Sequence, residues 1–305
     1  MLRATILDHG ARLVSLAFRT PDGWREQLLT LPRHDAYLED PYYIGALVGR
    51  YANRIRNGRF SIDGKPCQLD RNAFPHHLHG GAAGFDHRKW SLRQEGDTAL
   101  LALTSDDGEG GYPGRLDVTA TVRLSGASLI FEAMCTATAP THANLTWHPY
   151  FTLGEPDVAN LTLAVAAGRY VAVDDELIPT GDLPLVDNTP LDLRVPGRLG
   201  NVLERSHPLT AGTAGIDHCL VLDQAQDPAA ILASGAVSLS VHTDEPGLQV
   251  YTAGGMPTPH CAICLEPQHF PDSPNEPSFP PTLLLPGDTR TTRIRYAFSN
   301  TGEGP

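Results

Sequence analysis

The clearest strand signal in the sequence is the segment Leu116-Asp117-Val118-Thr119-Ala120-Thr121-Val122-Arg123-Leu124. Apolar and polar residues alternate along it without a fault, which is the period-two pattern of a strand with one buried face. Shorter stretches with the same alternation occur at residues 161–165, 238–242 and 293–298. The sequence therefore predicts strands in all four places.

A hairpin is expected around Asp63-Gly64, because these two residues separate extended runs at 60–62 and 65–69. Asp-Gly between two such runs is a strong hairpin signal. No segment keeps an amphipathic stripe of helical period over three turns. Helices are therefore expected to be few and short.

Composition and length favour one large all-β domain. Of 305 residues, 29 are Gly and 26 are Pro, roughly 18% together against about 12% in average usage, which indicates many turns. No linker, low-complexity tract or repeat divides the chain. We expect a single domain over residues 1–305, a large antiparallel β-sandwich whose concave sheet face can hold a ligand.

Charge and hydropathy narrow the possible partners and the location. The formal net charge of −12 argues against nucleic acid, since phosphate binding draws on clustered Lys and Arg. The longest apolar runs fall short of the ~20 residues that span a bilayer, and no signal-peptide core follows Met1. We therefore expect no membrane association and a cytoplasmic location.

Five cysteines, an odd number scattered along the chain, make a disulfide framework improbable. Cys261 and Cys264 form a C-x-x-C, but no second pair follows. We interpret both as buried structural thiols.

Glu266 is the candidate general base. It lies in Cys264-Leu265-Glu266-Pro267-Gln268-His269-Phe270-Pro271-Asp272-Ser273-Pro274-Asn275, where an apolar run meets a proline-rich loop. A carboxyl group in an apolar setting has a raised pKa and can act as a base near neutral pH. A carboxylate at a strand end that reaches solvent or pairs with an Arg is the alternative reading.

His148 is the candidate acid, enclosed by Trp147, Tyr150 and Phe151 and held extended by the Pro149 that follows it. Such a His can give a proton near neutral pH when a carboxylate is close. A core histidine with one backbone hydrogen bond is the alternative.

Two further clusters could carry chemistry. One is a group of four arginines within ten residues, Arg50, Arg54, Arg56 and Arg59. The fixed donor fork of Arg suits vicinal hydroxyls or a carboxylate, and solvated arginines are the alternative reading. His77 and His79 are two residues apart, so on a strand they would point the same way and could bind a metal if a third ligand were present.

Read together, these segments resemble the aldose 1-epimerase family, the galactose mutarotases, nearly from end to end. Seven motifs occur in the family's order: Val48-Gly49-Arg50-Tyr51-Ala52-Asn53-Arg54-Ile55, His77-Leu78-His79-Gly80-Gly81 with Gly84-Phe85-Asp86, Asp106-Asp107-Gly108-Glu109-Gly110-Gly111-Tyr112-Pro113-Gly114, His148-Pro149-Tyr150-Phe151, Ile216-Asp217-His218, Gln249-Val250-Tyr251-Thr252 and Leu265-Glu266-Pro267-Gln268.

The resemblance implies a β-supersandwich enzyme that interconverts the α and β anomers of a free aldose such as galactose or glucose, without a cofactor or metal. It implies Glu266 as the base that takes the anomeric hydroxyl proton and His148 as the acid on the ring oxygen. It also implies five residues that grip the sugar: Asn53, Arg54, His79, Asp217 and Gln249. A monomer or homodimer is expected.

Three departures from the family pattern bear on specificity: Trp147 before the acid, His76 before His-Leu-His, and a compact turn at residues 254–259. Three other functions stay open. An epimerase of a phosphorylated hexose would use the Arg cluster for the phosphate, a non-catalytic sugar-binding protein would dispense with the acid/base pair, and a metal-dependent hydrolase would use the histidines.

Overall fold

The computed structural model describes residues 1–204 and 206–301, and strands dominate it. The larger sheet has nine antiparallel strands in the order β18-β16-β20-β21-β25-β12-β11-β10-β9. Their bounds in that order are β18 (Gly197–Arg198), β16 (Thr162–Val165), β20 (Ala230–Ala233), β21 (Val237–Thr243), β25 (Arg290–Asn300), β12 (Ser128–Ala137), β11 (Leu116–Ser125), β10 (Thr98–Ser105) and β9 (Ser91–Glu95).

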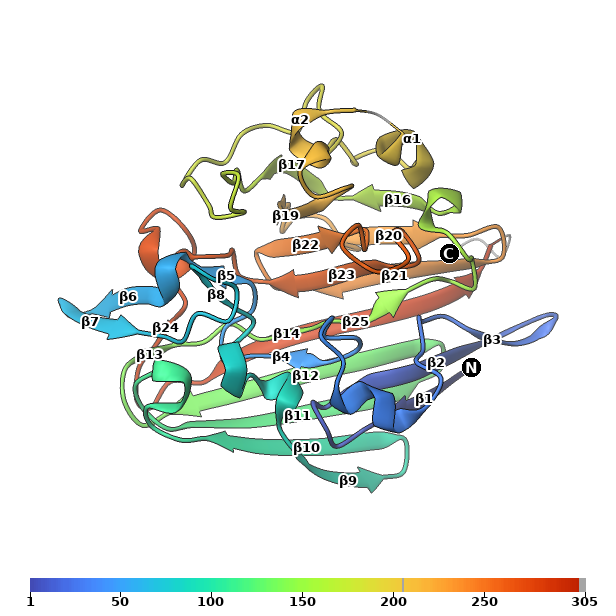
Figure 1. The fold of residues 1–305 in the computed structure, drawn as a ribbon. Coiled ribbons are helices and arrows are strands. Elements are labelled where there is room, and N and C mark those ends of the chain that lie inside the picture. The colour runs from blue at the N-terminus through green and yellow to red at the C-terminus, as the bar shows by residue number, and fades with distance from the viewer. Residues whose placement is uncertain (205, 302–305) are drawn as a thin grey trace.

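A second, five-stranded sheet has the order β15-β23-β22-β19-β17. Its strands are β15 (Tyr150–Phe151), β23 (Ile263–Gln268), β22 (Gly247–Tyr251), β19 (Asp217–Leu222) and β17 (Ala167–Tyr170). It packs on the larger sheet, since the Tyr296 hydroxyl on β25 donates to the Leu265 carbonyl on β23 at 3.2 Å, and Phe151 on β15 meets the Tyr296 ring edge-on. This is the expected antiparallel sandwich (Figure 1).

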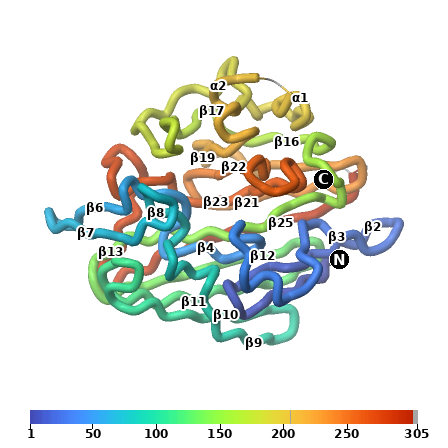
Figure 2. Tube along the Cα trace, viewed as in Figure 1, coloured from blue at the N-terminus to red at the C-terminus, as the bar shows by residue number. Residues whose placement is uncertain are grey.

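Smaller sheets complete the fold. One is a three-stranded sheet of β1 (Leu2–Ile6), β2 (Leu13–Thr20) and β3 (Gly23–Glu26). The other four have two strands each: β4 (Leu47–Val48) with β14 (Thr146–Trp147), β5 (Arg54–Ile55) with β8 (His77–Leu78), β6 (Arg59–Ile62) with β7 (Lys65–Gln68), and β13 (Thr141–His142) with β24 (Leu283–Leu284). The β6–β7 hairpin projects from one side of the molecule and the β2–β3 turn from the other (Figure 2).

Helix is a minor component, as predicted. The described residues contain two α-helices, α1 (Leu199–Leu203) and α2 (Pro208–Ala211), which lie together beyond β16 and β17 (Figure 1). Single 3₁₀ turns occur at His34–Leu38, Arg56–Gly58, Gly81–Ala83, Phe85–His87, Glu109–Gly111, Val158–Asn160 and Ser273–Asn275. Among the residues described, no helix has the length and apolarity that crossing a bilayer requires.

The predicted strands are confirmed. Along β11 the even-numbered residues from Leu116 to Val122 are buried, while the odd-numbered ones are more exposed. The other three alternating stretches correspond to β16, β21 and β25. The predicted hairpin is β6–β7, in which Ile62 pairs with Lys65, and Asp63 and Gly64 have φ of 50° and 75°, as a two-residue type I′ turn requires.

Candidate active site

The face of the five-stranded sheet that turns away from the core carries polar side chains. Residues opposite each other on antiparallel strands share a face, and Gln249 on β22 is opposite Glu266 on β23. Asp217 on β19 is opposite Tyr251, two residues from Gln249. The alternate residues Val250 and Leu265 belong to the apolar core. The register therefore places Asp217, Gln249 and Glu266 on one face.

A second wall comes from the β5–β8 ladder, where Arg54 pairs with Leu78. The His79 Nδ1 accepts from the Asn53 amide at 3.1 Å, and the Asn53 Oδ1 accepts from the Arg54 amide at 2.8 Å. Asn53 and His79 have φ of 65° and 52°, as does Tyr43 at 59°. Non-glycine residues held at positive φ are concentrated at functional sites in proteins.

These walls enclose a cavity of about 170 Å³. It is lined by all seven residues predicted from the sequence, Asn53, Arg54, His79, His148, Asp217, Gln249 and Glu266. The sequence reasoning did not propose six other lining residues, Pro41, Tyr42, Tyr43, Leu78, Tyr150 and Tyr251. Three of these, Leu78, Tyr150 and Tyr251, lie inside the motifs that carry the family resemblance. Nothing in the periodicity of the sequence marks residues 41–43.

Glu266 and His148 form a buried pair at the base of this cavity. The Glu266 Oε1 lies 3.5 Å from the His148 Nε2, and the two residues are only 2% and 4% exposed. Burial, and then the negative charge of Asp217, raises the pKa of Glu266 well above its ordinary value. Burial lowers the pKa of His148 to about 3. Burial therefore favours the neutral forms of both groups.

The other polar groups have defined hydrogen-bond directions. The Gln249 Nε2 donates to the Asp217 Oδ1 at 2.6 Å. The Gln249 Oε1 is buried and has no hydrogen-bond partner within residues 1–204 and 206–301. Burial lowers the pKa of His79, so its ring is neutral. Because its Nδ1 accepts from Asn53, its proton is on Nε2. His79 thus offers a donor and Gln249 an acceptor.

Aromatic rings fix the orientation of His148. Tyr150 stacks on its imidazole with ring centres 5.1 Å apart, and Tyr43 stacks at 6.2 Å. Trp147 instead packs on Phe131 in the core, and its indole N–H donates to the Ala11 carbonyl. The expectation that Trp147 encloses His148 is therefore wrong, and Tyr43 takes that place.

Of the other departures from the family pattern, neither His76 nor the turn at residues 254–259 contributes to the cavity lining among the described residues. His76 Nδ1 accepts from the Asn57 amide at 3.0 Å, which ties it to the backbone.

The expectation that His77 and His79 would point the same way on a strand is wrong. Strand β8 ends at Leu78, and the positive φ of His79 turns its side chain out of the alternation. His77 instead points toward Tyr112, whose hydroxyl is 2.8 Å from its Nε2, and its Nδ1 lies 2.8 Å from the Asp70 carbonyl. Both ring nitrogens of His77 are thus engaged away from the cavity.

The four arginines do not converge either. Arg50 is buried and donates to the carbonyls of Gly114, Ser105 and Asp106. Arg56 lies 3.5 Å from Asp272 and 3.7 Å from Glu276, and Arg59 is exposed outside the cavity. Arg54 is the member of the cluster that lines the cavity.

A buried ion pair supports the loop that carries Tyr42 and Tyr43. The Arg12 Nη1 lies 2.6 Å from the Asp40 Oδ2, and both side chains are almost inaccessible. Asp40 in turn accepts from the amides of Tyr42 and Ile44. Paired and hydrogen-bonded in this way, the charges fix the loop at the rim of the cavity.

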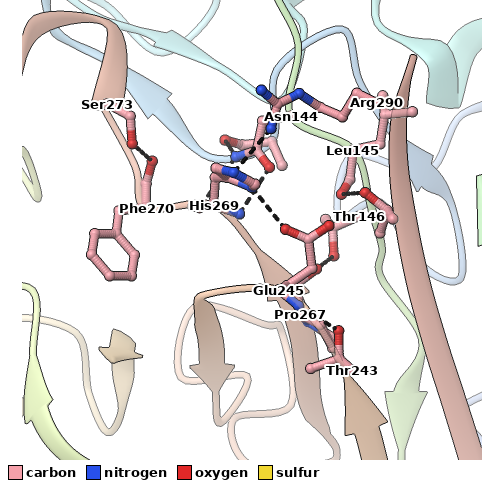
Figure 3. A network of polar contacts seen from close by, with 12 residues as sticks. Asn144, Leu145, Thr146, Thr243, Glu245, Pro267, His269, Phe270, Ser273 and Arg290 are labelled. Atoms are coloured by element: carbon pink, nitrogen blue, oxygen red, sulfur yellow. Dashed lines mark hydrogen bonds and ion pairs between the residues drawn. The ribbon is translucent and has the colours of Figure 1, made fainter. Parts of the chain in front are cut away.

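A polar network anchors the chain where it leaves β23 (Figure 3). The His269 Nδ1 lies 2.7 Å from the buried Glu245 carboxylate, and its Nε2 lies 2.9 Å from the Arg290 Nη1. Since Arg only donates, Nε2 accepts and Nδ1 donates. Asn144 accepts from the His269 amide and donates to the Ala52 carbonyl. The network thereby joins the segment after Glu266 to the one before Asn53.

We expect His269→Ala to lower the free energy of unfolding by about 1–3 kcal/mol, because Glu245 would lose a buried donor. Urea unfolding measures this, with the exposed His34→Ala as control. Equal stability of the two variants would show that the network contributes nothing to stability.

Asp272, in the loop after β23, has a titration that can be tested. Its Oδ1 accepts from the backbone N–H of Arg56 and from the side-chain Nδ2 of Asn275, and its side chain is inaccessible. Burial outweighs these donors and raises its pKa from 3.8 to about 6. The folded state therefore binds this proton more tightly than the unfolded state, and stability falls as pH rises from about 4 to 6.

The full pH-dependent loss of folding stability is expected to be roughly 3 kcal/mol, because the pKa is raised from 3.8 to about 6 and each pKa unit corresponds to about 1.36 kcal/mol. Asp272→Asn cannot ionise, so its stability relative to the parent protein should rise by most of this amount, about 2 kcal/mol, between pH 4 and pH 7. Urea unfolding at both pH values checks the difference. A constant difference would mean that Asp272 is not protonated more readily in the folded state.

The five cysteines are free, and Cys135, Cys219 and Cys264 are buried. Cys261 is partly exposed, so the expectation that both residues of the C-x-x-C are buried holds for Cys264 alone.

Comparison with known proteins gives a consistent result. The family model described as aldose 1-epimerase matches residues 1–297. Galactose mutarotase of Homo sapiens is 36% identical to this chain, and the match covers 98% of this chain and 92% of that protein. Aldose 1-epimerase of Escherichia coli is 34% identical, and the match covers 96% of this chain and 91% of that protein. The crystal structure of an aldose epimerase homologue from C. elegans superposes with a TM-score of 0.91 at 30% identity, covering 98% of this chain and 96% of that one. The chain belongs to the aldose 1-epimerase family.

Proposed function

We propose that this protein is an aldose 1-epimerase that interconverts the α and β anomers of a free aldose, with galactose or glucose as substrate. The observation that carries the proposal is the buried Glu266–His148 pair, 3.5 Å apart, at the base of a polar cavity. Anomer exchange requires one proton to be taken from an oxygen of the sugar and another to be given to a second oxygen. A base and an acid fixed beside one sugar ring supply both transfers.

In the proposed reaction, the Glu266 carboxylate takes the proton of the anomeric hydroxyl while protonated His148 gives a proton to the ring oxygen. The electron pair of the broken C–O bond goes to the ring oxygen, and the anomeric carbon becomes an aldehyde. The aldehyde then rotates, and the reverse transfers close the ring on its other face. No step consumes a cofactor.

The electrostatics of the pair suit this sequence. Two opposite charges attract by about 4 kcal/mol at 4 Å with an effective dielectric constant of 20, which supports the ionised pair before ring opening. Ring opening leaves Glu266 protonated and His148 neutral, and burial favours these forms of both groups. Burial therefore stabilises the protonation state of the open-chain stage.

Five residues are proposed to bind the sugar: Asn53, Arg54, His79, Asp217 and Gln249. Sugar hydroxyls both donate and accept, and these side chains offer both functions. The buried Gln249 Oε1 accepts no hydrogen bond from any residue that the structure describes, and a buried acceptor left unpaired costs about 1–3 kcal/mol. A hydroxyl of the bound sugar would satisfy it.

A phosphorylated substrate is poorly served by this cavity. Arg54 is accompanied there by the carboxyl groups of Asp217 and Glu266, while Arg50 and Arg56 have other partners. A phosphate dianion would thus meet two acidic groups and one cation.

Polarimetry of freshly dissolved α anomers tests the function. We expect faster mutarotation of α-D-galactose or α-D-glucose, and weaker acceleration of a hexose 6-phosphate. A preference for the phosphorylated sugar would contradict the proposed substrate class. A pentose in the same panel shows how strictly the cavity selects hexoses.

The cytoplasmic location, the single domain over residues 1–305 and a monomeric or homodimeric state remain predictions. Cell fractionation tests the location. Limited proteolysis of the purified protein tests the single domain, and light scattering tests the oligomeric state. A stable fragment smaller than the chain would contradict the single domain.

A further inference from the structure

Three metal-ligating side chains from two parts of the chain meet at the cavity wall. His148, Cys264 and Glu266 are all buried, and one ligand atom from each lies within 4.8 Å of the others. The sheet register builds this cluster. Cys264 and Glu266 are two residues apart on β23 and share a face, and Cys264 pairs with Tyr150, which follows His148 by two residues.

The cluster has free coordinating capacity. Among the residues that the structure describes, neither the buried Glu266 Oε2 nor the buried His148 Nδ1 has a hydrogen-bond partner. Glu266 is 2% exposed yet lines the cavity. A buried carboxylate oxygen without a donor is satisfied by a proton or by a cation.

The chemistry of the three ligands selects the metal. A thiolate, an imidazole nitrogen and a carboxylate oxygen are the ligand types of Zn²⁺, at about 2.0–2.3 Å from the ion. Tetrahedral ligands at these lengths are roughly 3.5 Å apart, so small side-chain rotations would close the cluster. The thiolate disfavours Mg²⁺ and Ca²⁺, which prefer oxygen. The fourth position would face the cavity.

We propose that Zn²⁺ binds to His148, Cys264 and Glu266 and thereby inhibits the enzyme. The inhibition rests on the proposed function, because the metal would occupy the acid and the base that ring opening uses. Binding releases the thiol proton and the proton of Glu266 to the buffer. The sugar and the metal then compete for one site.

Co²⁺ in place of Zn²⁺ gives a direct readout, since a thiolate bound to Co²⁺ produces a charge-transfer absorption. The protein is first stripped with a chelator and then titrated with Co²⁺ in the absence of sugar. We expect the absorption in the parent protein and in Cys261→Ala, its loss in Cys264→Ala, and displacement by Zn²⁺ and by galactose. Cys264 does not line the cavity, so this variant should keep its basal activity.

In the activity assay, Zn²⁺ should inhibit the parent protein and Cys261→Ala, and a chelator should reverse the effect. Cys264→Ala should need at least about tenfold more Zn²⁺ for the same inhibition. An absent charge-transfer absorption, or equal Zn²⁺ sensitivity of Cys264→Ala and the parent protein, would overturn the site. Cobalt binding without any mutarotase activity would instead refute the proposed function and leave the metal site standing.

Discussion

Glu266→Gln is expected to lower kcat by about 10²–10⁴-fold, the range typical of losing a general base. The amide is nearly isosteric with the carboxyl group, so the buried β23 should keep its packing. Because the variant cannot take a proton from the anomeric hydroxyl, the loss should fall on kcat more than on KM. Initial rates by polarimetry over a range of galactose concentrations measure both constants.

Glu245→Gln is the matched control, since Glu245 is also buried but lies in the network around His269. We expect it to lower stability and to leave kcat within a few fold. A Glu266→Gln protein with nearly full kcat would show that Glu266 is structural.

His148→Asn is expected to reduce kcat by about 10²–10⁴-fold with a comparatively small change in KM. The amide keeps a polar group beneath the sugar but cannot deliver a proton. Stacking with Tyr150 and Tyr43 is lost at the same time, so unfolding should be measured alongside the kinetics.

His142→Asn provides the comparison, because His142 is another buried histidine and lies outside the cavity, against Phe60. It should retain kcat. If His148→Asn raised KM alone, His148 would be a binding residue and His79 would become the next candidate for the acid.

The sheet framework could be predicted because its signals are local. Alternation in β11 and the Asp63-Gly64 turn each report a backbone conformation directly. The strand that carries Glu266 is different. All six residues of β23 are buried, so its pattern does not distinguish the core face from the cavity face. The register against β22 settles that question.

The cavity wall around Asn53 and His79 depends on conformations that periodicity does not encode. Both residues sit at positive φ, which is why the strand alternation assumed for His77 and His79 fails. The same holds for Tyr43, whose loop is held by Asp40 and, through the ion pair with Asp40, by Arg12, which is distant in sequence. The resemblance to a family identified seven of the cavity residues. The residue types alone had pointed to Glu266 and His148, and for both of these a structural reading stayed open.

The arginine cluster shows how burial reverses an interpretation based on charge. Four cations in ten residues suggest an anion site, yet Arg50 is inside the protein and satisfies backbone carbonyls. A guanidinium can serve many carbonyls at once because it has five donors. Sequence spacing does not reveal which carbonyls will surround it.

Magnetisation exchange between the anomers of galactose at equilibrium measures ring opening and closure by the protein without a coupling enzyme. We expect the protein to accelerate exchange between the α and β anomeric protons, and we expect Glu266→Gln and His148→Asn each to reduce the acceleration by about 10²-fold or more. Exchange at the uncatalysed rate with galactose, glucose and other free aldoses, in a folded protein, would contradict the proposed function.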